Sequence, residues 1–162
     1  MTSTMRIEKD FNEFLKLLNK NEVKYLIIGG FAYSFYAKPR YTKDLDIFVE
    51  RSEENAGKIM TAIIEFWGES AGLKKADFLQ KGTFIQMGYP PLRIDVTTHC
   101  EGLDFAAAWE NRIRAKYGVV DVYFISLPDL IKNKTACGRD QDLVDVKYLK
   151  KVEEATLPYR RS

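Results

Sequence analysis

The sequence predicts an α/β domain with one mixed β-sheet of about five strands and flanking helices. Three observations support this class. The chain has 162 residues, of which 46% are apolar, so it can bury a substantial core. Short apolar runs such as KYLIIGG and DLDIFVE predict strands, whereas longer segments repeat apolar residues at a spacing of three or four, which predicts helices. These segments follow one another in the order α-β-α-β-α-β-β-α-β-α-α, and such interleaving is typical of an α/β fold.

In the first half of the chain, apolar spacing and helix signals predict three helices and two strands. The two long helices repeat apolar residues on one face, and Ser52 is a suitable N-cap for the second of them. Pro39 ends the short helix, because proline disfavours helical backbone in the residue before it. The predicted elements are a helix over 8–19, a strand over 24–30, a short helix over 31–37, a strand over 44–50 and a helix over 53–67.

In the second half, the turn GYPP separates two strands, and the segment SLPD opens a helix. Ser126 and Asp129 are three positions apart, as in a capping box, and Pro128 lies in the first turn. Gly138 is expected to end that helix, and Asp140 to cap the last one. The predicted elements are strands over 83–88 and 92–98, a helix over 103–115, a strand over 119–125, and C-terminal helices from about 127 to 152. The whole of 1–162 is expected to form one domain.

Composition argues for some classes of function and gives no support to others. The formal net charge is +2, which gives no sign of the basic surface that nucleic-acid-binding domains carry. The two cysteines, Cys100 and Cys137, are not in a CxxC spacing, and they predict reduced thiols rather than a zinc site. The N-terminus MTSTMRIEKD lacks the apolar core of a signal peptide, and no apolar run approaches the ~20 residues of a membrane span. The sequence therefore predicts a cytoplasmic protein with no membrane partner.

The strand DLDIFVE carries two aspartates on one side. Asp44 and Asp46 are two positions apart, so their side chains project from the same face of the strand, ~6–7 Å apart along the chain. Like charges so placed repel one another, and they are tolerated in water or where a positive group lies between them. Two carboxylates that converge can hold a hard cation, which favours oxygen ligands.

Two further features precede and follow this strand. Gly29 and Gly30 end a buried strand and open a helix, where backbone N–H groups can approach an anion closely. Asp95 alternates with Ile94 and Val96, so it projects from the polar side of another strand. Each feature alone is explained by a tight turn or a solvated strand face, whereas the three together in this order form a pattern.

In this pattern the sequence resembles the DNA-polymerase-β-like nucleotidyltransferase superfamily. The matching segments are IIGG (27–30), RYTKDLDIFV (40–49) and RIDV (93–96). The stretch 129–149 is similar to the tail of small bacterial members, including abortive-infection and toxin–antitoxin nucleotidyltransferases. The resemblance spans roughly 20–150 and implies the nucleotidyltransferase fold. Many members have Gly-Ser at the phosphate turn, where this chain has Gly-Gly.

The resemblance implies a role for each matching residue. Asp44, Asp46 and Asp95 would be the catalytic residues and would hold two Mg²⁺ ions, with Asp95 also helping to deprotonate the acceptor hydroxyl. The nucleotide and its phosphates would be bound by Gly29, Gly30, Arg40, Thr42 and Lys134. For Arg40 and Lys134 the alternative is an ordinary surface position.

The resemblance also implies the partners. The donor is expected to be an NTP, by default ATP, and the acceptor to be a small molecule, a protein hydroxyl or a tRNA end. A homodimer and a partner protein of a toxin–antitoxin pair are further expectations. The rival hypothesis is a non-catalytic, antitoxin-like or interaction protein that keeps the fold. A third is an α/β protein of unrelated chemistry.

Five other side chains receive structural expectations. Asp142 and Asp145 lie three apart on one helix face; in the resembled tail these positions are functional or structurally paired, and here pairing with Lys or Arg is the favoured expectation. His99 is expected to be partly buried and hydrogen-bonded. Trp67 and Trp109 are expected in the core.

Overall fold

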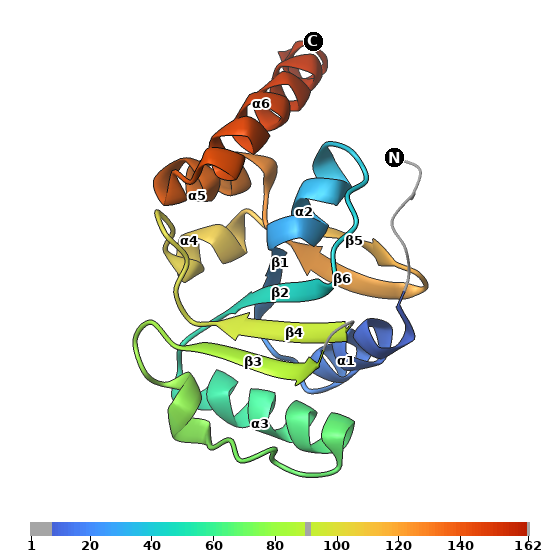
Figure 1. Ribbon diagram of the computed structural model, residues 1–162, viewed down its shortest axis with the longest axis vertical. Coiled ribbons are helices and arrows are strands. Elements are labelled where there is room, and N and C mark those ends of the chain that lie inside the picture. The colour runs from blue at the N-terminus through green and yellow to red at the C-terminus, as the bar shows by residue number, and fades with distance from the viewer. Residues whose placement is uncertain (1–7, 90–91, 162) are drawn as a thin grey trace.

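Six strands form one mixed sheet, with helices packed on both faces (Figure 1). The computed structural model describes residues 8–89 and 92–161. The strands are β1 (Tyr25–Ile28), β2 (Asp44–Val49), β3 (Phe84–Tyr89), β4 (Leu92–Thr97), β5 (Ile113–Tyr117) and β6 (Val120–Phe124). The helices are α1 (Lys9–Lys20), α2 (Gly29–Tyr36), α3 (Glu53–Trp67), α4 (Phe105–Glu110), α5 (Leu127–Cys137) and α6 (Asp140–Arg161), with a 3₁₀ turn η1 (Lys75–Phe78).

The order of strands across the sheet is β3-β4-β2-β1-β6-β5. The β2–β4 and β1–β6 pairs are parallel and the others antiparallel, so the predicted mixed α/β sheet is confirmed. Strands that are distant in sequence become neighbours at the centre. In particular, β2 and β4 lie side by side although about 40 residues separate them, and their register aligns Asp46 with Asp95.

The alternation in β2 divides its side chains between two packed layers. Leu45, Ile47 and Val49 are fully buried in the main core, which includes apolar residues of α1 and α3. Phe48 points the other way and joins Leu26 in a smaller cluster beneath α4. Because both ends of β2 are anchored by packing, the polar residues at its start are held in a fixed position.

The predicted helix signals operate as expected. The Ser52 side chain accepts a hydrogen bond from the Asn55 N–H at the start of α3, and Ser126 accepts one from the Asp129 N–H at the start of α5. Gly138 ends α5 in the left-handed conformation, with φ 66°. The tight turn there sets α6 against α5, which Figure 1 shows side by side at one end of the molecule.

The predicted helix over 103–115 is wrong in its second half, and this explains the sixth strand. Helix α4 ends at Glu110, and 113–117 forms β5. Antiparallel pairing with β6 buries Tyr117, while the exposed Arg114 and Lys116 both pair with Asp121. The run of three alanines at 106–108 ends before this segment, so cross-strand pairing decides its structure.

Three smaller expectations are also corrected. Trp67 is 39% exposed rather than in the core, since it lies in the last turn of α3 next to the edge strand β3. His99 is exposed rather than partly buried, although its ring is hydrogen-bonded to Glu101. Helix α6 continues beyond the expected end near Val152, to Arg161. Pro90 and Pro91 of the predicted turn lie outside the described residues.

No helix among the described residues is long and apolar enough to cross a membrane.

Candidate active site

Four charged side chains form a two-by-two arrangement on one face of the sheet. Asp44 and Asp46 project from this face of β2, and Arg93 and Asp95 from the same face of β4. The parallel register aligns Asp44 with Arg93 and Asp46 with Asp95. The three acids that the sequence singled out are therefore brought together, with an arginine as the fourth member.

Arg93 bridges two of the three acids. Its Nη2 lies 2.8 Å from Asp44 Oδ2, and its Nε lies 3.1 Å from Asp95 Oδ1. The repulsion expected between the aspartates of DLDIFVE requires water or a positive group between them. In this structure the guanidinium of Arg93 pairs with Asp44 of that strand, and it joins Asp44 to Asp95 rather than to Asp46.

Asp46 is the acid that Arg93 leaves without an ion pair of its own in the described structure. Its pKa is raised to about 7, first because of burial, then because of the charge of Asp95 and a hydrogen bond between the two carboxyl groups, and further because of Asp44. The charge of Arg93 opposes this rise without cancelling it. The cluster thus has too little positive charge around Asp46, and a proton makes up part of the difference near neutral pH.

The glycine turn lies directly against Asp46. Gly29 has φ 65°, in the left-handed region, and a Cβ placed on it would overlap Asp46 Oδ2. Ile28, at the N-cap position of α2, has no side-chain oxygen to accept from the first N–H groups of the helix. Amides at a helix N-terminus attract anions. The turn therefore sets backbone donors beside the carboxylates, which suits a ligand carrying both phosphate and metal.

We expect Gly29→Ala to destabilise the protein by roughly 2 kcal/mol, because alanine is strained at positive φ and its methyl group would displace Asp46. Gly30→Ala is the matched control. A Cβ there would meet the Thr42 Oγ1 at 3.0 Å, a contact that a small shift relieves, and its φ is not positive. Urea denaturation in EDTA measures both changes. Equal destabilisation by the two variants would contradict a special constraint at Gly29.

A cavity of about 380 Å³ opens beside Gly29, Asp46 and Asp95. A volume of this size is in the usual range of small-molecule sites. The remaining lining residues come from β1, β3, β4, the following loop, α5 and α6, and they are Ile28, Phe84, Thr97, His99, Cys100, Glu101, Asn133, Lys134, Cys137, Arg139 and Asp142. A larger cavity, of about 550 Å³, is bordered by residues such as Asn19, Lys58 and Arg114, and its described lining includes none of the three acids.

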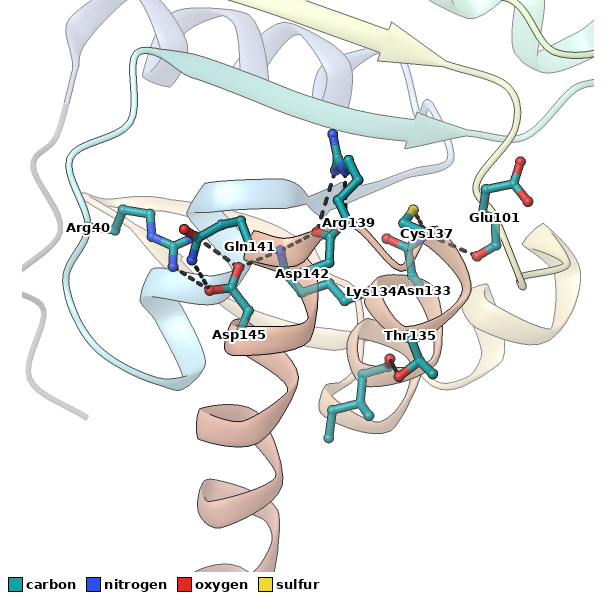
Figure 2. A network of polar contacts seen from close by, with 11 residues as sticks. Arg40, Glu101, Asn133, Lys134, Thr135, Cys137, Arg139, Gln141, Asp142 and Asp145 are labelled. Atoms are coloured by element: carbon teal, nitrogen blue, oxygen red, sulfur yellow. Dashed lines mark hydrogen bonds and ion pairs between the residues drawn. The ribbon is translucent and has the colours of Figure 1, made fainter.

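The far wall of the cavity is an ion-pair network that joins α5 to α6 (Figure 2). Lys134 is nearly buried, and its Nζ lies 2.9 Å from Asp145 and 3.5 Å from Asp142. Asp142 also accepts from Arg139, whose Nε is 2.7 Å away and whose side chain is largely exposed. The expected pairing of both aspartates with Lys or Arg is thus what the structure shows, and it leaves Lys134 and Arg139 facing the cavity.

Arg40 reaches the same network from the other side. Its guanidinium binds Asp145 in a bidentate pair, at 2.6 and 3.0 Å, and stacks over the ring of Tyr33. Burial raises the pKa of Asp145, but hydrogen bonds from Arg40, Lys134 and Gln141 outweigh it and lower the pKa to about 2. Arg40 therefore fastens the segment before β2 to helix α6.

The structure does not bring every predicted site residue to the cavity. Gly29, Asp46, Asp95 and Lys134 line it. Asp44 instead pairs with Arg93, Thr42 packs beside Gly30, and Arg40 pairs with Asp145. Sequence reasoning missed Arg93, Arg139 and Phe84. Arg93 had a signal, because it has the same strand parity as Asp95, but Arg139 and Phe84 reach the cavity only through the packing of other elements.

The oxygen atoms of the three carboxylates are of the type that binds divalent cations. Three carboxylates on two neighbouring strands are the hard oxygen ligands that Mg²⁺ prefers, and the raised pKa of Asp46 marks a shortage of positive charge among them. Among residues 8–89 and 92–161, however, no three Asp, Glu, His or Cys side chains are already gathered so that they could hold a metal ion. The three acids are therefore chemically suited to bind a divalent cation, but two of them are paired with Arg93 in this structure.

Solved structures with the same fold include antibiotic-modifying enzymes. The solution structure of the antibiotic-resistance factor ANT(2'')-Ia matches with a TM-score of 0.54 and 15% identity, over 94% of this chain and 90% of that one. The crystal structure of the lincosamide antibiotic adenylyltransferase LnuA, bound to lincomycin, matches with a TM-score of 0.53 and 15% identity, over 90% and 97%. ANT(2'')-Ia in complex with adenylyl-2''-tobramycin matches with a TM-score of 0.52 and 15% identity, over 94% and 97%.

None of the curated proteins compared with the chain matches it. A family model described as "Nucleotidyltransferase of unknown function (DUF6036)" matches residues 5–159. The mixed α/β fold is consistent with this match. The chain belongs to the DUF6036 family of nucleotidyltransferases.

Proposed function

We propose that this protein moves an NMP from an NTP, with ATP as the first candidate, to a hydroxyl group of a small acceptor molecule, with Mg²⁺ as cofactor. The observation that carries the proposal is the alignment of Asp46 with Asp95 next to the Gly29 turn, at the wall of a cavity that Lys134 and Arg139 also line. Carboxylates, backbone amides and cations around one space are the groups that phosphoryl transfer requires.

Asp44, Asp46 and Asp95 would hold two Mg²⁺ ions. Bound Mg²⁺ supplies charge neutralisation on the triphosphate and lowers the pKa of an acceptor hydroxyl. Asp95 accepts the proton of that hydroxyl, since it lies at the cavity wall next to Asp46. The burial of Asp95, which is 4% exposed, keeps competing water away from this proton transfer.

The triphosphate would lie between the glycine turn and helix α5. Backbone N–H groups of Gly29 and Gly30 bind phosphate oxygens, and the nearly buried Lys134 offers a cation from the opposite wall. Arg139 adds a second, more exposed cation. Arg40 and Thr42 act indirectly here, because Arg40 fixes α6 through Asp145 and Thr42 supports Gly30.

Two considerations favour a small acceptor over a protein or a tRNA. The cavity volume suits a small ligand, and the net charge of +2 gives no sign of a polynucleotide surface. LnuA and ANT(2'')-Ia, which have this fold, are described as bound to lincomycin and to adenylyl-tobramycin. Hydroxyl-bearing compounds of the antibiotic type are therefore the first acceptors to try.

The test is transfer of label from α-³²P-ATP, in the presence of Mg²⁺, to a panel of hydroxyl-bearing small molecules. We expect a labelled product that needs Mg²⁺ and disappears with Asp95→Asn. We also expect Mg²⁺ with a non-hydrolysable ATP analogue to raise the melting temperature by several degrees, since ligand binding to the native state stabilises it.

Thr83→Ser is the control, because Thr83 directly precedes strand β3 and is not among the residues that line the cavity. This variant should retain both the label transfer and the rise in melting temperature. Wild-type protein that neither binds Mg²⁺ and nucleotide nor transfers label would favour the non-catalytic alternative. Transfer to protein or tRNA in place of the small molecules would overturn the acceptor class while leaving the reaction intact.

A further inference from the structure

Arg93 binds the same carboxylate oxygens that a divalent cation would need. It contacts Asp44 Oδ2 at 2.8 Å and Asp95 Oδ1 at 3.1 Å, and its Nη2 is also 3.4 Å from Asp95 Oδ2. A Mg²⁺ ion sits about 2.1 Å from its oxygen ligands. An ion bound to Asp44 Oδ2 would therefore be no more than about 5 Å from the guanidinium nitrogen, and the two cations would repel strongly.

Arg93 offsets part of the negative charge of the acid cluster when no metal is bound. Asp44 and Asp95 pair with Arg93, while Arg93 makes no ion pair with Asp46 in the described structure. This arrangement explains why three acids of suitable chemistry are not already gathered as a metal site within the described residues.

The Arg93 side chain has a route away from the acids. About 30% of it is exposed, compared with 5% of the Asp95 side chain that it contacts. Its guanidinium can therefore rotate toward solvent without unpacking the core, whereas Asp95 is fixed in position. The movable partner in this ion pair is the arginine.

We propose that Arg93 is an internal counter-cation that occupies the acid cluster and must leave Asp44 and Asp95 when a divalent cation binds. Arg93 is then a positioning residue that sets the affinity for metal. This inference rests on the proposed metal site. It adds that metal loading competes with an arginine of the same chain.

The experiment titrates Mn²⁺ alone, as a probe for a hard divalent cation, and measures free Mn²⁺ by electron paramagnetic resonance. The variants are Arg93→Gln, which removes the charge, and Arg93→Lys, which keeps the charge but loses the fork that reaches both acids. We expect Mn²⁺ to bind about tenfold more tightly to Arg93→Gln and about threefold more tightly to Arg93→Lys than to the wild type.

A second readout separates competition from loss of structure. Melting in EDTA should show both variants to be less stable than the wild type, with Arg93→Gln the less stable of the two, because the acids lose their counter-cation. Arg139→Gln removes a charge from the cavity that Asp46 and Asp95 line, but it leaves the three acids as they are, so its Mn²⁺ affinity should change less than twofold.

The outcomes are distinguishable. Tighter binding by Arg93→Gln, with Arg93→Lys equal to wild type, would mean a general field effect and would overturn displacement. Weaker binding by Arg93→Gln would also overturn it. Absence of Mn²⁺ binding in every variant, together with no stabilisation by nucleotide and Mg²⁺, would overturn the metal site itself and the role of Arg93 with it.

Discussion

Replacing Asp46 by asparagine is expected to reduce nucleotidyl transfer about a thousandfold or more, and at the same time to stabilise the protein in EDTA at pH 8. Activity falls because a metal-binding carboxylate is lost. Stability rises because the amide keeps the shape of Asp46 and can donate a hydrogen bond to Asp95, but carries no negative charge in a partly buried position beside Asp44 and Asp95.

The pH dependence gives this prediction its sign. The pKa of Asp46 is about 7 in the folded protein and near 3.8 in the unfolded chain, so the folded state binds more protons between these values. Wild-type stability therefore falls as the pH rises from about 4 to about 7, by on the order of 2–4 kcal/mol. Asp46→Asn lacks this loss, so the advantage of the variant over the wild type should be clearly larger at pH 8 than at pH 5.

Thermal or urea denaturation in EDTA at pH 5 and pH 8 measures the difference. At pH 8 we expect the melting temperature of the variant to be at least about 5 °C higher, given the size of the chain. A variant that is less stable than the wild type at both pH values would show that Asp46 contributes to the fold, and the assignment of the cluster as a strained functional site would be wrong.

Replacing Asp145 by asparagine is expected to have the opposite effect on stability, a loss of about 3 kcal/mol at neutral pH. Asp145 is fully buried, and its carboxylate pairs with Arg40 and with the nearly buried Lys134. Removing the charge leaves these two cations with one anion fewer in a poorly solvated place. The docking of α6 against α2 and α5 should weaken as a result.

The contribution of Asp145 to stability also depends on pH in the opposite sense to that of Asp46. Its pKa is lowered to about 2, since hydrogen bonds from Arg40, Lys134 and Gln141 outweigh burial, so its contribution is present above about pH 4 and is lost as the pH falls toward 2. The difference between wild type and Asp145→Asn should shrink in that interval, which urea denaturation at pH 7, 4 and 3 can follow.

Asp121 provides the control for this prediction. Its pKa is lowered to about 2 as well, by hydrogen bonds from Lys116 and Arg114, but its side chain is 40% exposed. Solvent screens such a pair, so Asp121→Asn should change stability far less than Asp145→Asn. Equal effects would contradict the view that burial, rather than pairing alone, makes Asp145 important.

Much of the fold could be predicted from the sequence because its signals are local. The apolar stripes of α1 and α3, the Ser52 and Ser126 caps and the Gly138 stop all act within a few residues. Strand β5 could not be predicted, because its structure depends on pairing with β6, and no local pattern distinguishes it from the helical segment before it. The same is true of the exposure of Trp67, which depends on what packs against the end of α3.

In the candidate site, too, some features follow from the local sequence and others depend on tertiary packing. Parity within a strand places Asp44 and Asp46 on one face, and it does the same for Arg93 and Asp95. The roles of Arg40 and Lys134 depend on helix α6, which carries Asp145 from more than 100 residues away to Arg40. No spacing pattern in the sequence predicts the contact between Arg40 and Asp145.

The sequence by itself determined which acids share a strand face, where glycine permits a left-handed turn, and that neighbouring aspartates need either water or a positive partner. These follow from alternation and backbone geometry, which reach only a few residues along the chain. The tertiary structure alone decided that the partner of Asp44 and Asp95 is Arg93, and that Lys134 and Arg139 face the acids across a cavity. The reason is that the parallel register of β2 with β4, and the docking of α6, are set by packing between segments distant in sequence.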